Sequence, residues 1–288
     1  MNTSLKLSAY GAALAVLVVG TYAVGTAVGP PSRTNTAENT TAETSPVHAH
    51  EAGGLASTHD GYTLVPEQPV LGSGTFAFRI TGPDGAPVTA FDQVHEEPLH
   101  LIVVRRDTTG FRHVHPEMDA AGTWRVPLSV DSGGAYRAFA DFTPTGGPAT
   151  TLGVDLFAAG PFEPVTHTES RTSTVDGYAV ALDGDLVPGA TSPLRLTVTR
   201  DGAPVTDLEP YLGASGHLVA LRQGDLAYLH VHPDSGGAGP EIAFRADVPS
   251  AGIYRLFLDF QVGGVVRTAD FTATTTASVA RPAAGHGH

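Results

Sequence analysis

The chain has 288 residues, with 16 Lys and Arg against 29 Asp and Glu, and a formal net charge of −13. This balance argues against nucleic acid as a partner, because phosphate binding needs a basic surface. There is no cysteine, so disulfides and thiolate metal ligands are both excluded.

Residues 1–29 differ in character from the rest of the chain. The stretch from Leu7 to Gly29 carries no charge and reaches the roughly 17–25 residues of a membrane-spanning helix. We therefore expect an N-terminal transmembrane helix that anchors the protein. The alternative is a cleaved signal peptide, but Pro30 directly after Ala27-Val28-Gly29 disfavours cleavage. The remainder is expected on the extracytoplasmic face of the cell membrane, or secreted if the segment is cleaved.

Residues 30–56 are rich in Thr, Ala, Glu, Ser and Pro, which predicts a flexible linker. Beyond it the sequence repeats itself: Asp84–Thr89 recurs as Asp201–Thr206, and Gly134–Phe142 aligns with Gly252–Phe260. The period exceeds the roughly 20–50 residues of solenoid repeats, so it indicates tandem domains. We place the first at 57–163 and the second at 168–278, followed by a His-bearing tail at 279–288.

Both repeats contain short apolar runs separated by Gly, Pro and Asp, the pattern of β-strands. The fold class predicted is all-β, with two tandem immunoglobulin-like β-sandwich domains after the N-terminal helix. Tyr136 and Tyr254, each early in a late strand, are predicted core or corner residues. The clearest runs are Thr75–Thr81, Leu99–Val104, Tyr136–Phe142, Leu194–Thr199 and Tyr254–Phe260.

Six of the 13 histidines occupy matched positions in the two repeats. In the second repeat, Gly224-Asp225 lies between His217 and His230 and suits a two-residue type II′ turn. Such a turn pairs Val219 with His230 and His217 with His232. Side chains alternate along a strand, so three imidazoles of each repeat should share one face. The first repeat has the same register if its loop centres on Asp107-Thr108. The matched sets are His100, His113 and His115, and His217, His230 and His232.

Two histidines on one strand and a third on its neighbour predict a Cu²⁺ or Zn²⁺ site in each repeat. The alternative is that the imidazoles hydrogen-bond to one another and to carboxylates without metal. Asp141 and Asp259 are candidates for a fourth ligand or for orienting the histidines. Alternatively, each pairs with its own Arg137 or Arg255 on a solvated face.

The duplicated His-x-His-Pro and Tyr-Arg-x-Phe-x-Asp-Phe module resembles a group of exported, mostly uncharacterised bacterial proteins, over nearly all of 57–278. More distantly, it is similar to the periplasmic β-sandwich copper-binding proteins of copper resistance. This resemblance implies extracytoplasmic metal handling, carried by the six matched histidines. The N-terminal amine that the copper proteins use does not transfer, because a hydrophobic segment occupies this N-terminus.

The chain lacks a Gly-x-Ser-x-Gly elbow, a His-Glu-x-x-His helix and a phosphate-cradling loop, which argues against an enzyme. We expect a membrane-tethered extracytoplasmic metal-binding protein with two equivalent three-His sites, acting as buffer, carrier or sensor. The alternative is an adhesion or spacer protein with structural histidines and no metal. The expected partners are the metal ion and the membrane; no protein partner follows from the sequence.

Overall fold

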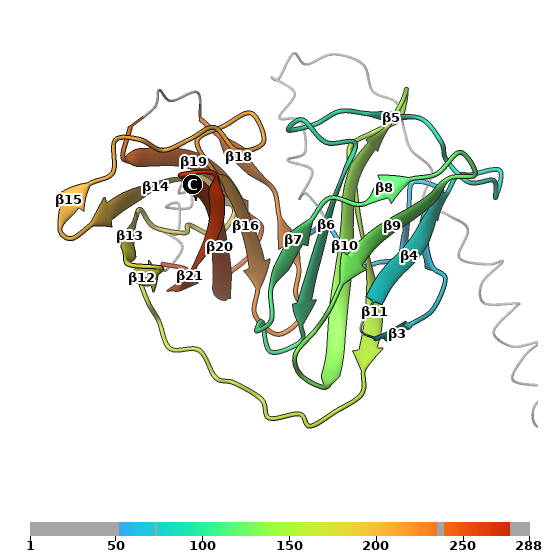
Figure 1. Cartoon of the computed structure of the whole chain (residues 1–288), viewed down its shortest axis with the longest axis horizontal. Helices are drawn as coiled ribbons and strands as arrows, with labels where there is room; N and C mark the ends of the chain where they lie inside the picture. Colours follow the sequence, from blue (N-terminus) through green and yellow to red (C-terminus); the bar gives the residue numbers. More distant parts are fainter. Residues whose placement is uncertain (1–51, 73, 235–238, 277–288) are drawn as a thin grey trace, which may run out of the picture. The chain divides into compact units, whose positions relative to one another are not determined.

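Each sequence repeat forms one β-sandwich (Figure 1), so the predicted all-β fold with two tandem domains is confirmed. The computed structural model describes residues 52–72, 74–234 and 239–276. The predicted anchor at 1–29, most of the linker and the tail lie outside these residues. Within the described ranges, no helix is long and apolar enough to cross a membrane.

The first sandwich contains a five-stranded sheet in the order β1-β2-β4-β9-β8 and a second sheet in the order β3-β11-β10-β6-β7, to which β5 adds through β10. These strands are β1 (Thr58–His59), β2 (Tyr62–Pro66), β3 (Val70–Leu71), β4 (Gly74–Thr81), β5 (Phe91–Asp92), β6 (Leu99–Arg105), β7 (Arg112–Val114), β8 (Glu117–Met118), β9 (Thr123–Leu128), β10 (Gly134–Pro144) and β11 (Thr150–Ala158).

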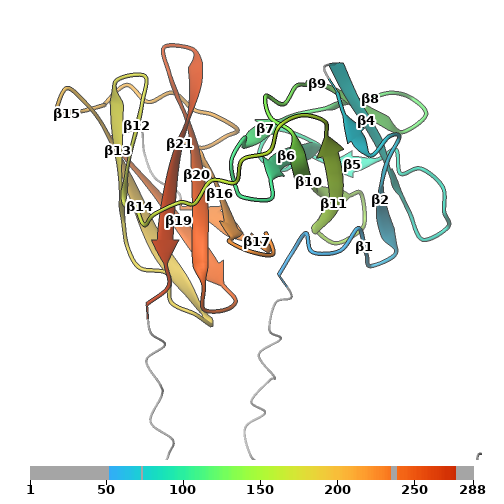
Figure 2. The same cartoon turned by 90° about the horizontal axis from the view of Figure 1, so that it is seen from below.

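The second sandwich contains a sheet in the order β12-β13-β14-β19-β18, with β15 added through β14, and a sheet in the order β17-β16-β20-β21 (Figure 2). These strands are β12 (Thr172–Val175), β13 (Tyr178–Asp183), β14 (Ala190–Arg200), β15 (Ala203–Pro204), β16 (His217–Arg222), β17 (Tyr228–Leu229), β18 (Val231–Pro233), β19 (Glu241–Val248), β20 (Ile253–Val262) and β21 (Val265–Thr274).

Strand alternation builds each core. Along β6, Leu99, Leu101 and Val103 point into the first core, and along β20 the alternate residues from Tyr254 to Phe260 point into the second. Tyr136 and Tyr254 are buried, and each hydroxyl donates to a backbone carbonyl four residues earlier, Ser132 and Ser250, at 2.8 Å. This is the tyrosine corner of immunoglobulin-like sandwiches, as the sequence predicted.

The hairpin registers next to the turns are as predicted, but the turn of the second repeat is not, and its predicted pairs Val219–His230 and His217–His232 do not form. Leu101 pairs with Val114 in the first repeat, and Ala220 pairs with Leu229 in the second. The loop after β16 has four residues, closed by Arg222 N donating to Ala227 O, with Leu226 at a φ of 62°. The predicted two-residue turn at Gly224-Asp225 is wrong, because the Asp225 carboxylate accepts from Arg222 Nε and Ala227 N and stabilises the wider loop.

The two sandwiches contact each other within a single compact unit, His48–His288. The side chains of β6, β10, β16 and β20 that face away from the cores pack together, so these strands are apolar on both faces. Phe111 and Phe257 stack across this contact with ring centres 4.1 Å apart. We call this set the interface cluster: Ile102, Val104, Phe139, Val219, Leu221, Leu226, Tyr228 and Phe257, with Phe111 packed against it.

The end of the predicted linker also bridges the two sandwiches. Gly53 O accepts from Tyr228 N at 3.0 Å, and Gly54 O accepts from Arg137 Nε at 2.9 Å. A Cβ on Gly54 would lie 2.4 Å from the Phe139 ring, and its φ is 71°, so only glycine fits there.

Phe257→Ala tests the interface cluster. Phe257 is buried, so we expect its removal to lower the free energy of unfolding by about 3–5 kcal/mol, as for other large-to-small core substitutions. Phe157→Ala is the matched control: Phe157 is 53% exposed, and we expect a change within about 0.5 kcal/mol. Urea unfolding of both variants measures this, and equal small effects would contradict an energetic role for the cluster.

Candidate metal centre

Three histidines of the first repeat converge beside the interface cluster. His100 lies on β6, where Leu99 and Leu101 on either side of it fill the core and turn its imidazole to the opposite face. His113 pairs with Ile102 across the β6–β7 hairpin and shares that face. His115 follows directly after β7. One nitrogen atom from each of the three lies within 4.8 Å of the others.

The hydrogen bonds of two of these rings determine which nitrogen carries the proton. His100 Nε2 lies 2.9 Å from the Val94 carbonyl oxygen, so Nε2 is the donor and Nδ1 has no proton. His113 Nδ1 lies 2.7 Å from Asp259 Oδ2, so Nδ1 is the donor, and in the neutral ring Nε2 has no proton. His100 Nδ1 and His113 Nε2, the nitrogens without a proton when both rings are neutral, face each other at 3.1 Å.

The third ring leaves a polar atom without a partner. His115 Nε2 is buried and forms no hydrogen bond with any residue that the structure describes. A buried polar atom without a hydrogen bond costs roughly 1–3 kcal/mol. A cation among these nitrogens would use the lone pairs of His100 and His113 and offer the third ring a partner, so the donor set fits a metal ion.

Burial keeps the imidazoles of His100 and His115 neutral. Burial, opposed by the hydrogen bond to Val94 and assisted by the neighbouring rings of His113 and His115, lowers the pKa of His100 to about 3. Burial and His113 lower the pKa of His115 to about 4. Unprotonated imidazole is the form that binds metal, so both rings can act as ligands well below neutral pH.

Asp259 orients His113 from the second repeat. Its carboxylate accepts from His113 Nδ1 and from Thr268 Oγ1, and the side chains of His113 and Asp259 are 1% and 3% exposed. A carboxylate on the second nitrogen of a ligating imidazole fixes the tautomer and raises the basicity of the ring. Asp259 therefore suits the orienting role, and it acts on the other repeat.

Asp141 occupies the equivalent place in the first repeat. It accepts from Thr151 Oγ1 at 2.9 Å. Burial raises its pKa, opposed by the Thr151 hydrogen bond and then by nearby His230. The alternative that the two aspartates pair with their own arginines is wrong: Arg137 donates to Asp155, and Arg255 donates to Asp270.

The second-repeat triad does not assemble. The ring centre of His217 lies 4.7 Å from that of His113 and 5.2 Å from that of His100, so His217 joins the first-repeat rings. His230 and His232 are exposed. The reason is a change of sheet: β17 ends at Leu229, and the chain continues in β18, which pairs with β19.

The structure therefore corrects the expectation of two equivalent three-His sites. Among the described residues, His100, His113 and His115 form the only group of three or more His, Asp or Glu side chains placed to hold one ion. The repeats contribute unequally, and the cluster lies where they meet.

Two further residues, His95 and Tyr211, lie beside the histidine cluster. The sequence did not single out either of them as a candidate site residue. His95, with a φ of 52°, has its ring centre 5.3 Å from that of His217. Tyr211 lies 6.5 Å from His115 between ring centres, and burial raises the pKa of its hydroxyl to about 12. Neither residue has a matching residue of its type in the other repeat, so comparison of the repeats did not identify them. For His95, the one indication in the sequence is that it lies five residues before His100.

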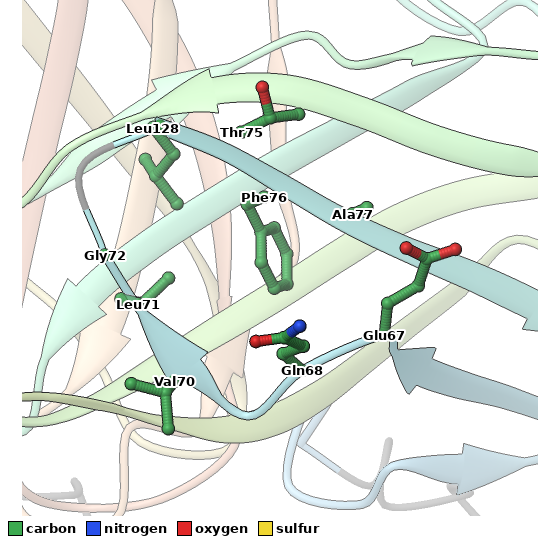
Figure 3. Close-up of a pocket in the computed structure, with 10 residues that line it drawn as sticks. Glu67, Gln68, Val70, Leu71, Gly72, Thr75, Phe76, Ala77 and Leu128 are labelled. Carbon is green, nitrogen blue, oxygen red and sulfur yellow. The ribbon is translucent and has the colours of Figure 1, made fainter.

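A separate cavity of about 340 Å³ opens in the first sandwich (Figure 3). Val70, Leu71 and Phe76 line it, with Glu67 and Gln68 at its edge. It shares no residue with the histidine cluster and contains no imidazole, so it is not part of the candidate metal centre.

Comparison with known proteins gives a family and a general likeness. The model of a domain of unknown function, DUF8832, matches residues 56–156 and 173–277, once in each repeat, which confirms the expectation of a duplicated, uncharacterised domain. No curated protein matches the chain.

Several solved structures are similar to the chain at low sequence identity. Invasin, a bacterial integrin-binding protein, is 12% identical, with a TM-score of 0.25 over 75% of this chain and 39% of its own. A putative membrane anchored protein from Corynebacterium diphtheriae is 8% identical, with a TM-score of 0.24 over 76% and 59%. A fibronectin type III pair from chicken tenascin is 11% identical, with a TM-score of 0.22 over 74% and 97%. This chain thus spans less than two thirds of the length of invasin and of the Corynebacterium protein. TM-scores this low carry no argument about function.

The lowered pKa values predict how the metal-free protein responds to acid. The unfolded chain binds protons near pH 6.5, but the folded chain keeps His100 and His115 neutral to about pH 3 and 4. The stability that these rings contribute is therefore complete above pH 6.5 and is lost as the pH falls toward 4. Each ring contributes a slope of up to about 1.4 kcal/mol per pH unit.

Urea unfolding in chelator between pH 7 and 4.5 measures this slope. We expect His100→Gln to flatten it, because one strongly depressed imidazole is gone, and the exposed His232→Gln to leave it unchanged. A slope equal in the wild type and His100→Gln would contradict a neutral, buried His100.

Proposed function

The chain belongs to the DUF8832 family, and from the geometry we propose that it binds a divalent transition-metal ion, Cu²⁺ or Zn²⁺, through His100, His113 and His115. One observation carries the proposal. When both rings are neutral, the hydrogen bonds to Val94 and Asp259 leave lone pairs on His100 Nδ1 and His113 Nε2 that face each other at 3.1 Å. Two lone pairs repel at that distance, and a cation between them turns the repulsion into two bonds.

The surroundings support the same proposal. The unpartnered Nε2 of His115 supplies a third nitrogen, and Asp259 supplies the carboxylate that commonly orients a ligating imidazole. Nitrogen ligands without thiolates suit Zn²⁺ and Cu²⁺. The distant resemblance to periplasmic copper-resistance proteins remains a prediction, and it makes Cu²⁺ the first ion to test.

We propose that the protein binds its ion rather than using it for catalysis. Held on the extracytoplasmic face by the hydrophobic segment at 1–29, it would act as a metal buffer, carrier or sensor. The pattern of its sequence motifs suggests no substrate.

A metal-free role has a specific observation in its favour. The His113–Asp259 pair joins the two sandwiches through a buried contact. If His113 carries two protons beside Asp259, its Nε2–H donates to His100 Nδ1 and the histidines are structural. This is the adhesion or spacer alternative, in which a rigid pair of sandwiches presents other surfaces to a partner.

Metal titration separates the two functions. The reference protein is the full chain purified without an affinity tag, with Ala at His48, His50, His286 and His288 to remove loosely binding tail histidines. We expect it to bind one equivalent of Cu²⁺ or Zn²⁺ by calorimetry, and its melting temperature to rise with metal. In the structural role, metal leaves both measurements unchanged.

His113→Ala tests the site itself. The substitution removes one of three ligands together with the contact to Asp259, so we expect affinity to fall at least about 100-fold. His232→Ala is the matched control, because His232 is exposed and lies outside the convergent group. Binding by His113→Ala at the reference affinity would rule out this site.

Asp259→Asn tests the orienting carboxylate. All three ligands remain, but the acceptor of His113 Nδ1–H loses its charge, so we expect a fall in affinity of about 10–100-fold. Asp270→Asn is the control: Asp270 pairs with Arg255 and its side chain is 51% exposed. Equal affinities for the two variants would show that Asp259 does not orient a ligand.

A further inference from the structure

We propose that His217 of the second repeat is the fourth ligand, so that one ion per chain is shared by the two sandwiches. This inference rests on the proposed function and adds to it the coordination and the stoichiometry. It replaces one site in each repeat by a single composite site.

Strand register brings His217 to the ion. On β16 and β20, His217 pairs directly with Asp259. Asp259 accepts from His113 Nδ1 across the contact between the sandwiches. The same carboxylate that orients one ligand therefore has His217 as its cross-strand neighbour, on the same face of the sheet.

Five of the six separations among the four rings are close to those of imidazoles around one ion. A metal–nitrogen bond of about 2.0–2.1 Å, plus roughly 1.1 Å from nitrogen to ring centre, separates tetrahedral ring centres by about 5.2 Å. The three first-repeat rings lie 4.9–5.3 Å apart. His217 lies 5.2 Å from His100 and 4.7 Å from His113, close to that spacing.

The imidazole of His217 is available for this role. Neither of its nitrogens has a hydrogen-bond partner among the residues that the structure describes. Burial, followed by the neighbouring histidines, lowers its pKa well below 6.5 and leaves it neutral. The nitrogens of His217 are outside the group that lies within 4.8 Å, so binding requires its ring to turn about Cβ–Cγ, which leaves the ring centre in place.

The other groups nearby fit less well. Tyr211 is 6.5 Å from His115 between ring centres, and its hydroxyl holds its proton strongly. Asp141 accepts from Thr151, and its raised pKa favours the protonated form. His95 is 6.1 Å from His100, farther than the tetrahedral spacing.

Cobalt(II) is the probe, because its visible absorption reports the coordination number. We expect the reference protein with Ala at the four tail histidines to bind one equivalent of Co²⁺ with the intense absorption of a tetrahedral site. His217→Ala should lower the affinity at least tenfold and weaken that absorption as water replaces the ligand. His232→Ala, its partner from the predicted second triad, should match the reference in both.

The outcomes separate this inference from the proposed function. Unchanged affinity and absorption in His217→Ala overturn His217 as a ligand and leave the three-His site standing. No Co²⁺ binding by the reference protein overturns both. His217→Gln serves as a second variant that keeps the bulk of the side chain, and near-ultraviolet circular dichroism in chelator checks that each variant is folded. A stoichiometry of two in the reference protein also overturns the shared site.

Discussion

The apolar contact between the outward faces of β6 and β10 and those of β16 and β20 is the constraint on which the candidate site depends. The interface cluster removes water from both sheets, and the His113–Asp259 hydrogen bond crosses the contact in its buried part. A polar group buried away from water destabilises the fold unless it has hydrogen-bond partners there. The placement of Asp259 and His217 beside the first-repeat histidines follows from this contact rather than from either sandwich alone.

Desolvation gives the cluster its chemistry. Exposed imidazoles would be partly protonated near pH 6.5, whereas burial lowers the pKa of His100 and His115 to about 3 and 4. The backbone carbonyl of Val94 and the carboxylate of Asp259 then determine which nitrogen of each ring keeps its proton. The result is a set of convergent nitrogen donors in which His100 and His115 become protonated only at low pH. Unprotonated imidazole is the form that a metal site requires.

Duplication has produced two similar domains but unequal sites. Thr151 and Thr268 donate to Asp141 and Asp259 in the same way, so the carboxylates are equivalent. The histidines are not, because the strand after β16 leaves its sheet at Leu229 and carries His232 to β19. His217 remains with the first-repeat rings. One copy therefore supplies the three convergent histidines, and the other contributes Asp259 and His217 beside them.

Local patterns in the sequence determined the strands, the two-domain repeat, the hairpin registers and the convergence of His100, His113 and His115, because alternation and pairing act between neighbours along the chain. Leu99–Val104 has apolar residues on both faces, which indicates that both faces of its sheet are buried. The sequence pattern does not identify the surface that packs against the outer face. Tertiary structure alone decided that the second repeat provides it, that Asp259 reaches His113, and that His95 and His217 join the cluster. These contacts join residues far apart in the chain, and they form only when two separately folded surfaces meet.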